Sequence, residues 1–139
     1  MSPSRARILL VEDDESDILH FQRLCKKRGI VAEVTIATSG DDALSILRGQ
    51  GSLEASRYVI VTDLNMPGLN GHELIEEVRG DAQLETSVIF VLSTSDLPDD
   101  IERAYRQHVA GYIVKDEAGT RLEAGVAMLE SYLHAVTLH

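Results

Sequence analysis

The stretch VTDLNMPGLNG, residues 61–71, places one carboxylate, Asp63, where an apolar run meets a turn rich in Pro, Gly and Asn. Three other groups able to do chemistry also follow apolar runs. They are the acidic residues Glu12-Asp13-Asp14, the hydroxyls Ser93-Thr94-Ser95, and Lys115. An aspartate can attack phosphorus and form an aspartyl phosphate. A hard cation such as Mg²⁺ takes oxygen ligands and neutralises charge on a transferring group, while an ammonium and a hydroxyl can hold the remaining oxygens.

The elements that must position these groups are strands and helices in alternation. Apolar runs rich in β-branched residues predict strands over residues 7–11, 31–37, 57–61, 87–92 and 111–114. The segments between them show helical spacing. Near-continuous apolar strands alternating with helices are typical of an α/β fold, here a doubly wound five-stranded parallel sheet covered on both faces.

Terminal signals delimit the helices. The first carries Ile18, Phe21 and Cys25 on one face and stops at Gly29. The second opens at Ser39–Asp42, the third after Gly71, and the fourth near Pro98; the fifth starts near Ala118 and is expected to run towards residue 139. Either Asp14 or Ser16 could cap the first helix.

The carboxyl ends of parallel strands are where ligands bind in such sheets. If the first and third strands are neighbours, Glu12, Asp13 and Asp63 crowd together there, and a bound cation removes their mutual repulsion. Each group alone has a simpler explanation as a helix cap, a turn or a solvated lysine. Their occurrence together, each at its own strand end, favours a site.

The composition of the chain excludes several classes of protein. The 139-residue chain has a formal charge of −10, which argues against general binding of nucleic acid. No apolar run approaches the roughly 20 residues of a membrane helix, and the N-terminus lacks the pattern of a signal peptide. The lone Cys25 excludes an intramolecular disulfide, and we expect a cytoplasmic protein.

Taken together, these motifs resemble the receiver domains of bacterial two-component response regulators. LLVEDDES resembles the acidic pocket of that family, DLNMPGLNG its phosphoacceptor loop, VLSTS its switch hydroxyl, and GYIVK its switch aromatic and lysine. The resemblance covers almost the whole chain. It implies a flavodoxin-like (βα)5 fold with strand order 2-1-3-4-5, and a single receiver domain over residues 1–139 with no effector domain.

The resemblance also implies a role for each matching residue. Asp63 is the phosphoacceptor, Lys115 binds the phosphoryl group, and Ser93 is the switch hydroxyl that closes on it. Tyr112 is the aromatic switch that turns inward when that hydroxyl moves. The cofactor is Mg²⁺, held by Asp13, Asp63, the backbone carbonyl of Asn65 and, through a water, Glu12.

The implied activity is signalling rather than enzymatic turnover of a substrate. A sensor histidine kinase donates the phosphoryl group, and the face made by the fourth helix, fifth strand and fifth helix then changes its protein binding, or the group passes to a phosphotransfer protein. Within the family, the long linker before the third strand, the LSTS segment and the ending YIVK with its Glu-rich helix resemble the stand-alone regulators of bacterial phytochrome kinases.

Two positions depart from the family pattern. Asp116 follows Lys115 where the family usually has proline in a cis peptide. A non-proline cis bond costs about 3 kcal/mol, so this substitution favours a trans peptide and a differently routed loop. Asn70 stands where aspartate is common.

The last helix carries two adjacent apolar stripes. One contains Leu122, Val126, Leu129, Leu133 and Val136, and the other contains Gly125, Met128, Tyr132 and Ala135. One stripe suffices to cover the sheet. The second either widens the core-facing surface or forms a homodimer contact through the fifth strand and helix.

Two rival functions are weaker. A phosphatase of the haloacid dehalogenase type also uses an aspartate nucleophile with Mg²⁺, but it requires a second carboxylate two residues on, where this chain has Asn65. A degenerate receiver acting only as a binding module would lack the acceptor, the acidic pair or the lysine, and all of these are present.

Overall fold

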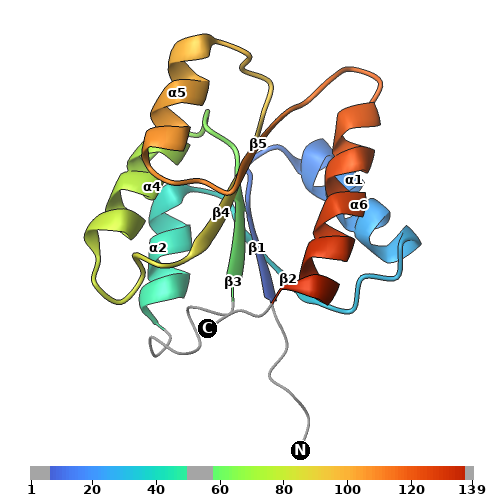
Figure 1. Cartoon of the computed structure of the whole chain (residues 1–139), viewed down its shortest axis with the longest axis horizontal. Helices are drawn as coiled ribbons and strands as arrows, with labels where there is room; N and C mark the ends of the chain where they lie inside the picture. Colours follow the sequence, from blue (N-terminus) through green and yellow to red (C-terminus); the bar gives the residue numbers. More distant parts are fainter. Residues whose placement is uncertain (1–6, 50–57, 137–139) are drawn as a thin grey trace, which may run out of the picture.

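The computed structural model describes residues 7–49 and 58–136 (Figure 1). The strands are β1 (Arg7–Val11), β2 (Glu33–Ala37), β3 (Tyr58–Thr62), β4 (Val88–Ser93) and β5 (Gly111–Val114). The helices are α1 (Glu15–Lys27), α2 (Gly40–Arg48), α4 (Gly71–Gly80), α5 (Pro98–Arg106) and α6 (Thr120–Ala135). Three sequence predictions fall partly outside the described residues: Arg57 as the start of the third strand, the linker 50–57 before it, and the end of the last helix at 137–139.

The strands form one parallel sheet in the order β2-β1-β3-β4-β5, which confirms the predicted topology. Val11 at the end of β1 is in register with Ala37 of β2 and Thr62 of β3. The carboxyl ends of these three strands therefore lie level with one another at one edge of the sheet.

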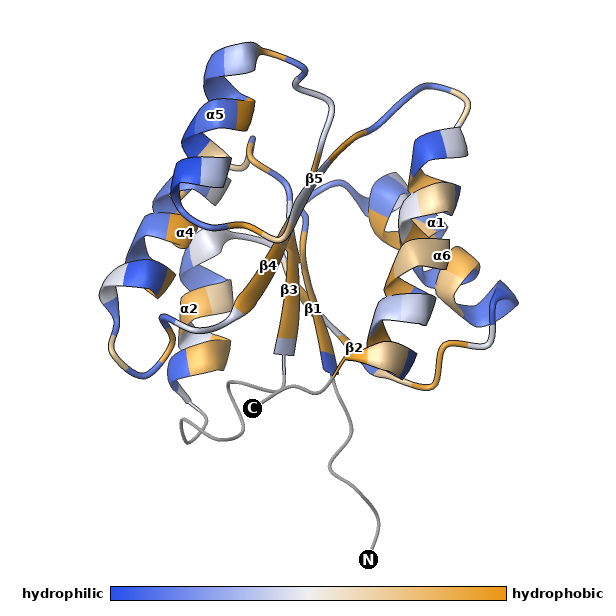
Figure 2. Ribbon diagram, in the orientation of Figure 1, coloured by the Kyte–Doolittle hydropathy of each residue, from blue (hydrophilic) through white to orange (hydrophobic). Residues whose placement is uncertain are grey.

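Helices cover both faces of the sheet, with α1 and α6 on one side and α2, α4 and α5 on the other (Figure 1). Alternate residues of β1 enter the two cores: Ile8 and Leu10 pack with α1 and α6, whereas Leu9 and Val11 pack on the opposite side. Because both faces are buried, the central strands are mostly apolar, while the helices turn their polar residues outward (Figure 2).

The predicted element boundaries hold to within two residues at most strands. β1 and β5 have the expected bounds, and β3 and β4 each end one residue later than expected. The second strand begins at Glu33 rather than residue 31, because Val31 lies in the preceding loop with 70% of its surface exposed. At the other end of the chain, α6 stops at Ala135, and Val136 is extended and exposed.

Side-chain caps fix where two of the helices begin. The carboxylate of Asp14, rather than the hydroxyl of Ser16, caps α1 by accepting a hydrogen bond from the amide of Asp17 at 3.0 Å. Asn70 caps α4 in a reciprocal capping box with Glu73. Asparagine at position 70 thus supplies the same side-chain acceptor that an aspartate would supply.

The second stripe of α6 is largely used within the fold. Gly125 packs against Ile113, where an added Cβ would lie 2.8 Å from its Cδ1. Met128 and Tyr132 pack against the core that α1 and α6 share, and the ring of Tyr132 meets that of Phe90 edge-on at 5.4 Å. These contacts favour the interpretation of a wide core-facing surface.

Arg79 at the end of α4 joins two loops at the opposite edge of the sheet. Its guanidinium donates hydrogen bonds to four backbone carbonyls, those of Glu85, Ser87, Gln107 and His108. One side chain therefore satisfies acceptors in the loops that precede β4 and β5.

Among the helices in the described ranges, none has the length and apolar character needed to cross a membrane.

Candidate functional site

The backbone ladder of the sheet continues one residue past β1, β3 and β5 at the carboxyl edge. The amide of Glu12 donates to the carbonyl of Ala37, that of Asp63 to Val11, and that of Lys115 to Ser93. These bonds of 2.8–3.0 Å fix the backbones of three functional residues relative to one another. The prediction that Glu12, Asp63 and Lys115 meet at this edge is therefore confirmed.

The carboxylate of Asp63 is oriented by its own loop. Its Oδ1 accepts the amide of Leu64 at 2.7 Å, which leaves Oδ2 facing Lys115. The loop closes at Gly71, whose amide donates to the carbonyl of Leu64. A Cβ at position 71 would lie 2.1 Å from the carbonyl oxygen of Asp63, so only glycine fits.

The ammonium of Lys115 lies among three carboxylates. Its Nζ donates to Oε1 of Glu12 at 2.9 Å and to Oδ2 of Asp17 at 3.0 Å, and it lies 3.7 Å from Oδ2 of Asp63. The Lys115 side chain is only 9% exposed. One cation thus faces three anions, and Asp13 adds a fourth carboxylate nearby.

Burial and the neighbouring charges shift the pKa values of Glu12 and Lys115, the two most buried groups of this cluster. Burial, together with the charge of Asp63, raises the pKa of Glu12 from 4.5 to about 7, although Lys115 opposes the rise. For Lys115, burial alone would lower the pKa, but the hydrogen bond to Glu12 and the charge of Asp63 raise it above its usual range. At neutral pH the lysine is an ammonium, and Glu12 is partly protonated.

The carboxylates fit a small hard cation. One oxygen each from Glu12, Asp13 and Asp63 lies within 4.8 Å of the others. Glu12 also accepts the amide of Asp13 at 3.0 Å, which holds its second oxygen in place. Oxygen-only donors of high charge, one of them exposed, suit Mg²⁺, which binds through few carboxylates and keeps several waters.

The two predicted switch residues lie beside this cluster. Ser93 ends β4 with its side chain fully buried, and its Oγ accepts the amide of Ser95 at 3.2 Å. Tyr112 on β5 is half-buried, and its hydroxyl donates to the carbonyl of Ser95 at 2.8 Å. The peptide after Lys115 is trans, as Asp116 in place of proline favours.

Sequence reasoning missed one member of the cluster, Asp17. It occupies the first turn of α1, where acidic residues commonly favour the helix dipole, so its residue type gave no separate signal. Only the position of the start of α1 near Lys115, which follows β5, shows that the Asp17 carboxylate contacts the Lys115 ammonium.

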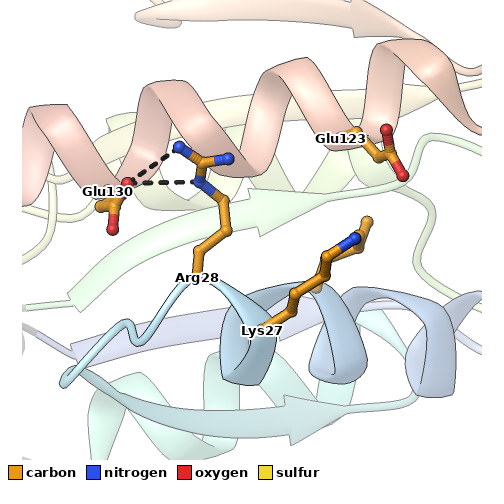
Figure 3. A pocket seen from close by; sticks show the side chains of 5 residues that line it. Lys27, Arg28, Glu123 and Glu130 are labelled. Carbon is orange, nitrogen blue, oxygen red and sulfur yellow. Dashed lines mark hydrogen bonds and ion pairs between the residues drawn. The ribbon is translucent and has the colours of Figure 1, made fainter.

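A second concave region lies far from these residues. It is a groove between α1 and α6, lined by Leu24, Lys27, Arg28, Glu123 and Glu130 (Figure 3). Arg28 bridges it with a hydrogen bond and ion pair to Glu130 at 3.1–3.2 Å. None of the carboxylates around Lys115 lines this groove. The Arg28–Glu130 ion pair in it joins the end of α1 to α6, which is a structural role.

An acidic cluster, a lysine and a buried hydroxyl at the carboxyl edge of a five-stranded parallel sheet define a phosphoacceptor type of site. The sequence pattern of the response regulator receiver domain matches residues 8–127, and the chain belongs to that family.

Two relatives have most of their length in common with this chain. Response regulator Rcp1 of Synechocystis sp. is 35% identical over 134 residues, covering 94% of this chain and 91% of Rcp1. The probable methanogenesis regulatory protein FilR2 of Methanothrix harundinacea is 29% identical over 126 residues, covering 90% of this chain and 81% of the relative.

Solved structures of response regulators are similar to this chain in fold and sequence. The phosphorylated cyanobacterial phytochrome response regulator RcpA is 32% identical with a TM-score of 0.83, covering 97% of this chain and 99% of that one. The Mn²⁺-bound form of Rcp1 is 34% identical with the same TM-score, covering 96% and 99%.

Proposed function

We propose that Asp63 accepts a phosphoryl group from a partner histidine kinase in a reaction that requires Mg²⁺. The observation that carries this proposal is the orientation of Asp63: its Oδ2 faces the Lys115 ammonium at 3.7 Å, while its Oδ1 accepts the amide of Leu64. Oδ2 attacks phosphorus and forms the P–O bond as the P–N bond to the kinase histidine breaks. The electron pair of that bond returns to the imidazole nitrogen, which takes up a proton.

Asp13, Asp63 and the backbone carbonyl of Asn65 would hold the metal, and Glu12 would act through a water. When bound, Mg²⁺ supplies positive charge that offsets the charge on the transferring group. The Mn²⁺-bound form of the relative Rcp1 supports a divalent site in this family. Glu12 and Asp63 are already oriented by backbone amides, so the chain presents its carboxylates before any cation arrives.

The remaining residues bind and sense the phosphoryl group. Lys115 shifts from Asp17 towards the phosphoryl oxygens, and the hydroxyl of Ser93 donates to one of them. Tyr112 follows Ser93 and turns its ring inward. The face made by α5, β5 and α6 thereby changes its affinity for a partner protein, or the phosphoryl group passes on to a phosphotransfer protein.

The protein is a signalling receiver that catalyses only its own phosphorylation and dephosphorylation. The haloacid dehalogenase alternative remains unsupported, because Asn65 is exposed and offers no acid. We propose that residues 1–139 form one receiver domain that works in the cytoplasm and binds neither nucleic acid nor membrane. The partner is a phytochrome histidine kinase, since RcpA is described as a phytochrome response regulator.

A homodimer through the fifth strand and helix is a second part of this proposal. Among the described residues, β5 is an edge strand that pairs with β4 alone, and its own residues are all partly exposed. Light scattering at micromolar concentration, with and without a phosphoryl mimic, is expected to show twice the monomer mass. A monomer under both conditions would contradict the dimer without affecting the role of Asp63.

Reduction with borohydride tests the acceptor itself. An aspartyl phosphate is reduced to homoserine, which peptide mass spectrometry locates. After incubation with a small phosphodonor and Mg²⁺, we expect homoserine at position 63. Homoserine at Asp13 or Asp17 instead would refute the assignment of Asp63.

A further inference from the structure

Ser95, in the loop between β4 and α5, has every polar group engaged. Its amide donates to Oγ of Ser93 at 3.2 Å, and its carbonyl accepts the hydroxyl of Tyr112 at 2.8 Å. Its own Oγ donates to Oδ2 of Asp100 at 2.5 Å and accepts the amide of Leu97 at 3.4 Å. Both predicted switch residues are therefore bonded to one serine, which in turn is bonded to α5.

Asp100 extends this set of contacts to α4. Its second oxygen, Oδ1, lies 3.0 Å from Nε2 of His72, the second residue of α4. Hydrogen bonds from Ser95 and His72 lower the pKa of Asp100, so the carboxylate is charged. The side chain of His72 is only 9% exposed, which leaves water little access to the contact.

The two helices joined in this way lie side by side on one face of the sheet (Figure 1). Both begin next to the phosphoacceptor region. α4 starts at Gly71, which closes the loop of Asp63, and α5 starts three residues after Ser95. The residue at the N-cap of α5, Leu97, offers no side-chain acceptor, so Ser95 and Asp100 fix the first turn of that helix.

We propose that Ser95, Asp100 and His72 form a relay of positioning residues that holds the Ser93 hydroxyl and transmits its movement to the starts of α5 and α4. The proposal rests on the proposed function, in which Ser93 closes on a phosphoryl group at Asp63. Ser93 cannot move without drawing or losing the amide of Ser95. A poorly solvated polar group left unpaired costs about 1–3 kcal/mol, so the relay moves as a unit rather than breaking at Ser93.

The alternative is a purely local role, in which Ser95 and Asp100 only cap α5. Capping would stabilise the first turn but would not link the environment of Ser93 to His72. A substitution at His72 therefore distinguishes the two roles. It should affect Ser93 and Ser95 if the relay exists, and it should not affect them if Ser95 and Asp100 only cap α5.

Amide and imidazole NMR of the whole chain separates them. The variants are His72→Leu, which leaves Asp100 without its partner, and His72→Gln, which keeps a side-chain donor. Arg106→Gln is the matched control, because Arg106 pairs with Glu102 at an exposed position of α5, whereas Arg103 also acts on the charge of Asp100. Each protein is measured alone and with Mg²⁺ and beryllofluoride, a phosphoryl mimic.

In the free proteins we expect His72→Leu, but not Arg106→Gln, to shift the amide signals of Ser95 and Ser93. On addition of the mimic to the wild type, we expect the Ser93 amide, the first turn of α5 and the His72 imidazole to shift together. In His72→Leu the shift at α4 and α5 should fall to less than half while that at Ser93 remains. His72→Gln should recover most of it, and the control should match the wild type.

Unchanged Ser93 and Ser95 signals in free His72→Leu would overturn the relay, and so would a full response of α5 to the mimic in that variant. Failure of the folded wild type to bind the mimic at all would instead contradict the proposed function. If the wild type does not bind the mimic, the amide shifts of Ser93 and Ser95 in the free His72→Leu protein still show whether these residues are linked to His72.

Discussion

Replacing Glu12 by glutamine is expected to stabilise the metal-free protein above neutral pH. The pKa of Glu12 rises from 4.5 to about 7 on folding, so between these pH values the folded chain binds more protons than the unfolded chain. The free energy of unfolding therefore falls as pH rises through this interval. A rise of that size corresponds to about 3 kcal/mol by the usual conversion of pKa into free energy.

The rise in pKa already includes the opposing hydrogen bond and charge of Lys115. Solvent screening at this partly exposed cluster reduces the gain, so we expect a net stabilisation of about 1–2 kcal/mol at pH 8. For a chain of this size the midpoint should rise by roughly 3–8 °C. At pH 5 Glu12 is mostly neutral in the folded chain but already largely ionised in the unfolded chain, so the difference should fall to less than half of its value at pH 8.

Thermal unfolding in chelator at pH 5 and pH 8 measures this directly. Glu15→Gln is the matched control, an exposed acid in the first turn of α1 whose loss should change little at either pH. Adding Mg²⁺ at pH 8 should reverse the order, because the cation stabilises the wild type more than the variant. A Glu12→Gln protein less stable than the wild type in chelator at pH 8 would refute the reasoning, since the Lys115 ion pair would then outweigh burial.

Three further predictions concern residues around this cluster. Asp17→Asn should free Lys115 for the phosphoryl group and tighten beryllofluoride binding about fivefold, as expected for roughly 1 kcal/mol; unchanged or weaker binding in a titration would contradict a competing role for Asp17. Gly71→Ala should destabilise the fold by more than about 3 kcal/mol in urea unfolding and weaken Mg²⁺ binding, because its Cβ would overlap the carbonyl of Asp63. Arg79→Ala should cost about 2–4 kcal/mol in the same assay, since four carbonyls lose their donor, yet leave Mg²⁺ affinity unchanged; a loss below 1 kcal/mol would show that water replaces the guanidinium.

Much of the fold follows from local signals in the sequence. Apolar runs located the strands, and Ser39, Pro98 and Gly71 marked helix starts, because these residues act through local backbone chemistry. Val31 misled the prediction because an apolar side chain does not reveal whether the chain there enters the sheet. Val136 misled it similarly, since the helix ends one residue earlier.

The site was predictable for a different reason. Glu12, Asp63 and Lys115 each follow a strand, Ser93 ends one, and a parallel sheet brings all such positions to one edge. The side-chain contacts that the helices make had no comparable signal in the sequence. The approach of Asp17 to Lys115 and of His72 to Asp100 depends on helix placement and side-chain torsions, which residue spacing does not determine.

Intact mass after incubation with a small phosphodonor tests the central claim most directly. The wild type and Asp63→Asn are each measured with Mg²⁺ and with chelator. We predict a gain of one phosphoryl group only in the wild type with Mg²⁺. A gain of the same size in Asp63→Asn, or in chelator, would contradict a Mg²⁺-dependent phosphoacceptor at Asp63.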